Sequence, residues 1–170
     1  FRVKPAAEMY TEGGMVKLNT EVYGGPILYT WFDRPLSLAG RVLLRTTNPL
    51  KPEVRRLKIE RPLLVIPHIA IHFNRQVNEG NHLSKQVDML PVIGIINEKL
   101  ETDNLLLKVI AKELDVEMTD ILDFDLSLYD TQKATLVGLN NEFISCGRLD
   151  DLAMVHAGLY ALLHSSATPM

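Results

Sequence analysis

Short apolar stretches separated by glycine and proline occupy the first 60 residues, and this pattern predicts strands. A clearer alternation follows at 122–129, where Phe124, Leu126 and Leu128 occupy every second position. Two other segments carry apolar residues at helical spacing, the later one being a convincing amphipathic helix. The strands expected on these grounds are 1–4, 15–18, 27–32, 39–45, 54–60 and 122–129, and the helices are 105–114 and 151–163. A β-rich chain with two helices belongs to the α+β (mixed) class.

The apolar run at 61–72 ends in two histidines and is the most distinctive stretch of the chain. Pro67 in its middle conflicts with a helix, so we expect an extended strand. His68 and His72 would then lie on one face about 13 Å apart, too far to share one metal ion. A helical pair could share one, but Ile69 stands where the glutamate of the helical zinc-protease motif would be. Each histidine, taken alone, is interpreted as half-buried and hydrogen-bonded to a neighbour.

Composition narrows the class of protein. With 170 residues, 46% of them hydrophobic, the chain can bury one good core, or one core plus a fragment of another. A net charge of −3 implies no broad basic surface, so we expect no nucleic-acid partner. The single cysteine, Cys146, excludes an internal disulfide, fits a reducing compartment and is interpreted as a small buried residue. No apolar run is long enough to span a bilayer, so we expect a soluble, cytoplasmic protein without a membrane partner.

The residues alone offer little catalytic chemistry. They contain no phosphate-binding glycine loop, no serine nucleophile elbow and no cysteine ligand pair. The notable carboxylates are Asp150 and Asp151, at the start of the last predicted helix. Acidic residues there are stabilised by the helix dipole, which favours a capping role. A carboxylate at a strand-to-helix junction is also a candidate metal ligand, and the pattern leaves both interpretations open.

Several sequence blocks occur in one order along nearly the whole chain. They read YGG at 23–25, WFDRPL at 31–36, AGR at 39–41, ERP at 60–62, IPHIAIH at 66–72, NR at 74–75, LYDTQ at 128–132, EFI at 142–144 and RLD at 148–150. In this order they resemble the aspartyl aminopeptidase and vacuolar aminopeptidase I family of zinc metallopeptidases. Several blocks in sequence are far more specific than any one of them.

The resemblance implies a domain organisation. In this family an α/β catalytic domain holds two zinc ions, and a β-rich, barrel-like domain inserted in it makes the dimer contact. Dimers assemble into dodecamers. Residues 1–20 and 129–170 would then be pieces of the catalytic domain, and 21–128 the inserted domain. Because the chain begins at Phe1 rather than at a methionine, we expect it to be a piece of a larger protein.

The resemblance also assigns roles to two residues. Asp150 matches the carboxylate that bridges the two metal ions, and Asp151 stands where many members have asparagine. His68 matches the histidine that the inserted domain sends into the partner subunit's active site, where it contacts substrate; His72 keeps its structural interpretation. The first metal-binding histidine would lie upstream of Phe1, and the paired glutamates and later ligands beyond Met170. No catalytic residue is expected in the chain itself, and a lone carboxylate cannot hold two zinc ions tightly.

These implications lead to a function in two layers. Within its parent protein, the chain would belong to a zinc aminopeptidase that removes N-terminal residues from peptides, with acidic and neutral specificities both represented in the family. Taken alone, it would be a catalytically inactive oligomerisation or binding module. A third interpretation is an unrelated β-rich binding domain, favoured if the blocks proved scattered in space.

Overall fold

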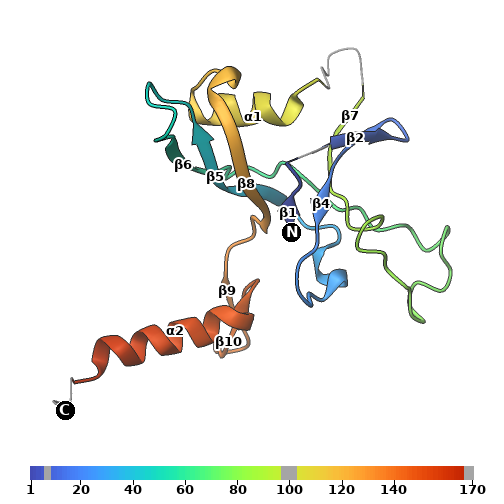
Figure 1. Cartoon of the computed structure of the whole chain (residues 1–170). Helices are drawn as coiled ribbons and strands as arrows, with labels where there is room; N and C mark the ends of the chain where they lie inside the picture. The colour runs from blue at the N-terminus through green and yellow to red at the C-terminus, as the bar shows by residue number, and fades with distance from the viewer. Residues whose placement is uncertain (6–8, 97–102, 167–170) are drawn as a thin grey trace. The chain divides into compact units, whose positions relative to one another are not determined.

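The computed structural model of the chain describes residues 1–5, 9–96 and 103–166 (Figure 1). It divides into two compact units, Phe1–Thr131 and Gln132–Met170. The first unit contains two sheets and helix α1, and the second contains a hairpin and helix α2. Within the described ranges, no helix is both long and apolar enough to cross a membrane.

A five-stranded antiparallel sheet forms the centre of the first unit. Its order is β4-β1-β8-β5-β6. The two long central strands pair along their whole length, so the apolar side chains at alternate positions of both enter one core. In β8, Phe124, Leu126 and Leu128 are buried while Asp123 faces solvent, as the alternation predicted. The strands are β1 (Arg2–Val3), β4 (Thr20–Glu21), β5 (Leu36–Leu44), β6 (Glu53–Lys58) and β8 (Ile121–Asp130).

A three-stranded sheet lies in the same unit, in the order β2-β3-β7. Its strands are β2 (Met9–Glu12), β3 (Met15–Leu18) and β7 (Val92–Ile95). Gly13 and Gly14 both have positive φ, which allows the tight turn between β2 and β3. The two sheets are joined by the extended residues Leu64, Val65 and Ile66, which form isolated bridges to Leu36, Val92 and Phe32 respectively.

Helix α1 (Leu105–Leu114) has the bounds that the sequence predicted. Leu106 and Ile110, four residues apart on one face, are fully buried in the core of the unit. Two arginines from the strand side hold the end of the helix: Arg55 donates to the Leu114 carbonyl at 3.3 Å, and Arg61 pairs with Glu113 at 2.5 Å. The short 3-10 helix η2 (Met118–Asp120) then leads into β8.

The second unit contains the hairpin β9 (Thr135–Val137) and β10 (Phe143–Ser145), followed by α2 (Leu149–His164). Every described residue from 132 to 166 is exposed. Neither hairpin strand was predicted, whereas α2 was predicted within two residues at its start. Cys146, expected to be buried, is exposed.

Two predicted strands are wrong in whole or in part. Residues 27–32 form the 3-10 helix η1 (Leu28–Trp31), in which the hydroxyl and N–H of Thr30 both donate to the Ile27 carbonyl. These local bonds replace a strand ladder. Of the strand expected at 61–72, only residues 64–66 form β-bridges, and at its end the Phe73 N–H closes a turn on the Ala70 carbonyl. His72 therefore lies in a turn and does not share a strand face with His68.

The mixed class is confirmed, but the barrel-like form is not. The strands that the structure describes make three open sheets, and the five-stranded one ends at β4 on one side and β6 on the other. Closing a sheet requires its two edge strands to pair. No such pairing occurs among the described strands.

Candidate functional site

His68 follows directly on the extended segment that joins the two sheets. Ile66, two residues earlier, is fully buried and anchors the segment. Pro67 has no N–H to donate and keeps Ile66 extended. His68 itself is half-buried, so its ring lies at the edge of the core rather than inside it. The buried Ile66 therefore fixes the chain just before His68, and His68 lies at the surface of the unit.

Two aromatic rings surround His68. Its ring lies 4.7 Å from that of Phe32 and 6.2 Å from that of Tyr29, measured between centroids. The Tyr29 hydroxyl donates to the Asn81 carbonyl at 3.2 Å, which ties η1 to the loop before β7. The Nε2 atom of His68 is buried and has no hydrogen-bond partner among the described residues. A buried ring nitrogen without a partner is costly in a purely structural histidine, so the hydrogen-bonded structural interpretation fits His68 poorly.

Asp33 forms hydrogen bonds with the backbone of the segment that contains His68. Its N–H donates to the Ile66 carbonyl at 2.9 Å, and its Oδ1 accepts the N–H of His68 at 3.0 Å. Asp33 lies inside the WFDRPL block, but no role was predicted for it. The signal that could have found it is its local chemistry, since aspartate is one of the few residues that adopt positive φ readily and accept a nearby backbone N–H.

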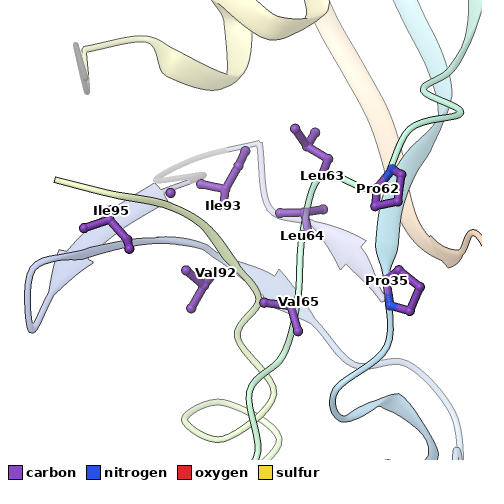
Figure 2. Close-up of a pocket in the computed structure, with 9 residues that line it drawn as sticks. Pro35, Pro62, Leu63, Leu64, Val65, Val92, Ile93 and Ile95 are labelled. Carbon is purple, nitrogen blue, oxygen red and sulfur yellow. The ribbon is translucent and has the colours of Figure 1, made fainter. Parts of the chain in front are cut away.

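An apolar groove lies beside this segment. Figure 2 shows residues 62–65 running beside Val92, Ile93 and Ile95 of β7. Apolar side chains from both segments line a space of about 380 Å³. The lining residues are Pro35, Pro62, Leu63, Leu64, Val65, Val92, Ile93, Gly94 and Ile95. None of these carries an ionisable or nucleophilic side chain, so the groove has no acid, base or nucleophile of its own.

Asp150 lies in the second unit, in the first turn of α2. Its backbone and that of Asp151 are non-helical, and the peptide bond between them is cis. No side-chain cap is found at this end of the helix, where Arg148 occupies the N-cap position. The capping interpretation of the two carboxylates is therefore not supported by a hydrogen bond.

The described residues do not make a zinc site by themselves. Among them, no group of three or more His, Cys, Asp or Glu side chains is placed to hold a metal ion. Asp150 is a single exposed carboxylate, whereas a protein zinc site needs three or four ligands.

Comparison with known proteins decides the family. The family described as "Aminopeptidase I zinc metalloprotease (M18)" matches residues 1–170. The chain belongs to this family. The resemblance read from the sequence blocks is therefore confirmed, and the family is one of zinc enzymes.

Relatives in this family are longer than the chain. A probable M18 family aminopeptidase 2 of Clostridium acetobutylicum is 58% identical over 168 residues, which are 99% of this chain and 39% of that protein. The structure of mApe1 from Chaetomium thermophilum is similar with a TM-score of 0.82 and 35% identity, covering 99% of this chain and 40% of that one. A structure of the S. cerevisiae mApe1 dodecamer has a TM-score of 0.71 at 25% identity, covering 95% and 35%. The chain thus spans about 39% of the length of the curated relative compared here.

Proposed function

We propose that the chain is part of a zinc-dependent aminopeptidase that removes N-terminal residues from peptides. Within that enzyme it provides the domain through which two subunits associate and the histidine, His68, that contacts substrate in the partner subunit's active site. The observation that carries this proposal is the family match over the entire chain. The buried, partnerless Nε2 of His68 supports it, because such an atom is suited to a ligand from outside the described residues.

The proposed assembly is a dimer, with dimers associating into a dodecamer. One similar solved structure is a dodecamer of mApe1, and that protein's assembly is the support for proposing the same here. The exposed apolar side chains of the His68 loop fit an association surface. They include Ile69, Ile71 and Phe73, of which Phe73 is 81% exposed.

The proposed domain boundaries are those of the sequence analysis, with 21–128 inserted between catalytic pieces at 1–20 and 129–170. The division of the chain into compact units between Thr131 and Gln132 supports the second boundary. At the first boundary, β1 pairs with β8 and β4, so residues 1–20 share a sheet with the inserted domain. The complete absence of buried side chains in the described part of 132–170 fits a piece that the remainder of a catalytic domain covers.

Asp150 is proposed as one ligand in a site of two zinc ions. The remaining ligands would come from parts of the enzyme other than this chain, in keeping with the 39% of the relative's length that the chain spans. Because the described residues supply only one candidate ligand, the chain alone is expected to be inactive and to bind zinc weakly.

The experiment compares Asp150→Asn with Asp151→Asn in the full-length enzyme, measuring zinc content by mass spectrometry and release of N-terminal residues. Asp150→Asn should lower kcat by at least roughly 100-fold and reduce bound zinc, because a ligand is lost. Asp151→Asn is the matched control and should stay within about threefold, since its carboxylate is not a proposed ligand. Full zinc content and activity in the Asp150→Asn enzyme would refute the proposed ligand.

A second candidate function is a catalytically inactive, stand-alone oligomerisation or binding module. The observation that favours it is that the described residues hold no group able to bind a metal ion. Zinc titration of the purified 170-residue chain, with an aminopeptidase assay on the same sample, tests the inactivity that both functions predict for the isolated chain, and the Asp150→Asn comparison in the full-length enzyme distinguishes them. Stoichiometric submicromolar zinc binding or peptidase activity in this sample would contradict the expected inactivity of the isolated chain.

A further inference from the structure

We infer that Asp33 is a positioning residue for His68. Its N–H donates to the Ile66 carbonyl at 2.9 Å and its Oδ1 accepts the His68 N–H at 3.0 Å, so one residue holds the chain on both sides of Pro67. The effect on catalysis rests on the proposed function, in which His68 contacts substrate. The effect of Asp33 on the position of the His68 backbone does not depend on the proposed function.

Asp33 is suited to this task by its backbone and its side chain together. Its φ of +55° lies in the left-handed region, which aspartate, asparagine and glycine adopt most readily. The short carboxylate then reaches a backbone N–H that lies nearby. Glycine would keep the conformation but lose the acceptor, and asparagine would keep both. This difference supplies a matched pair of variants.

The residues beside Asp33 are themselves anchored. Phe32 forms the parallel bridge to Ile66. On the other side, Arg34 forms an ion pair with Asp130 at 2.5 Å, at the end of β8. Asp33 is therefore held between two fixed points, and its carboxylate can transmit that position to the N–H of His68.

The ring of His68 depends on this backbone contact. The buried Nε2 has no hydrogen-bond partner among the residues that the structure describes, and the ring packs near Phe32 and Tyr29. The Asp33 carboxylate accepts the backbone N–H of His68. Losing it frees the backbone that sets the ring's position.

The first measurement is amide hydrogen exchange of the 170-residue chain by NMR. In the unsubstituted chain the His68 amide should be protected, because it donates to Asp33. Asp33→Gly should speed its exchange at least about tenfold, whereas Asp33→Asn should stay within about threefold. The amide of Leu126 in β8 should be unaffected in both and reports that the fold is intact.

Two results would overturn the inference. One is a His68 amide in the unsubstituted chain that exchanges as fast as an unstructured amide, a test that needs no variant. The other is equal protection of that amide in Asp33→Gly and in the unsubstituted chain.

The second measurement is a double-mutant cycle in the full-length enzyme. If Asp33 acts through His68, Asp33→Gly should lower kcat/KM by roughly 10–100-fold, and adding it to His68→Ala should cause no further loss. Asp33→Asn should restore most of the activity. Multiplicative losses in the double variant would show that Asp33 acts independently of His68 and would overturn the inference. An enzyme unaffected by His68→Ala would instead refute the proposed substrate contact, and the amide exchange would still decide the role of Asp33.

Discussion

Apolar side chains from the sheets and α1 meet in one buried cluster within Phe1–Thr131, whereas every described side chain of Gln132–Met170 is exposed. Both units are rich in leucine, so leucine content does not account for the difference. In β8 the apolar residues occupy every second position and can all face one way. In α2, beyond Asp151, apolar residues occur on all sides of the helix. A helix of that kind is normally buried from all directions, which one hairpin cannot provide.

The first unit contains its own buried core, whereas the described part of the second unit buries no side chain. Leu152, Val155, Leu159 and Leu162 form the predicted apolar stripe of α2, and each is at least half exposed. The helix was predicted correctly, but its apolar residues are not confined to that stripe, and the spacing of apolar residues does not say what covers them.

The largest expected effect on stability comes from replacing leucine by alanine at one position in each unit. Leu126 of β8 is 0% exposed, so Leu126→Ala should lower the free energy of unfolding by about 3 kcal/mol through lost burial and a residual cavity. Leu159 of α2 is 55% exposed, and Leu159→Ala should change it by less than about 0.5 kcal/mol. Urea denaturation of the 170-residue chain measures both. Equal losses would mean that α2 is covered in solution and would end the distinction between the units.

A glycine in each unit sharpens the comparison. A Cβ at Gly40 would lie 2.0 Å from the Asp125 carbonyl oxygen, where the central strands β5 and β8 pair. Gly40→Ala should therefore destabilise the first unit by about 2 kcal/mol. A Cβ at Gly158 in α2 would meet nothing within 4 Å, and Gly158→Ala should stabilise that helix by up to about 1 kcal/mol.

Thermal unfolding, monitored by circular dichroism, measures the effect of both glycine substitutions. The expected pair of results is a lower midpoint for Gly40→Ala and greater helicity at low temperature for Gly158→Ala. An unchanged midpoint for Gly40→Ala would show that β5 and β8 can separate at this point without loss, against the close approach seen between them.

The spacing of apolar residues was enough to predict the strands and the helix that bury one face against the core. The bounds of β3 and α1 were predicted correctly, and β8 extends one residue beyond its prediction at each end. Residues 27–32 were misread because their aromatic side chains satisfy contacts far along the chain. Trp31 stacks on Phe1 with centroids 4.2 Å apart, and this packing is available from a 3-10 turn as well as from a strand.

The candidate site was less predictable than the fold. His68 was found through resemblance to a family, and its aromatic neighbours and the backbone contact to Asp33 depend on segments 35 residues apart in sequence. Asp150 was found in the same way, but the structure brings no other ligand to it among the described residues. Spacing within one strand or helix cannot reveal contacts of this kind.

The smallest expected effect concerns charge. On β8, Asp125 pairs with Arg41 and Arg2, each at 3.0 Å, and all the ion pairs that the structure describes lie in the first unit. The hydrogen bond from Arg41, followed by the charges of both arginines, holds the pKa of Asp125 below its ordinary value of 3.8 despite some burial. The ionised form is therefore favoured by folding. Its contribution is fully present above about pH 3.8 and is lost as the pH falls through the lower pKa of the folded state.

Asp125→Asn tests this contribution. Because the carboxylate is 42% exposed and screened by solvent, the variant should lose only about 0.5 kcal/mol at pH 7. The difference from the unsubstituted chain should shrink in 1 M salt and vanish near pH 2, about where both chains carry an uncharged side chain at this position.

The matched control is Glu142→Gln in the β9–β10 hairpin, where hydrogen bonds from the backbone N–H groups of Glu142 and Asn140 also lower the pKa of the carboxyl. Since Glu142 lies in the unit without a core, its substitution should leave the unfolding of the first unit unchanged at every pH. A shift of that transition by Glu142→Gln would show that the two units unfold together.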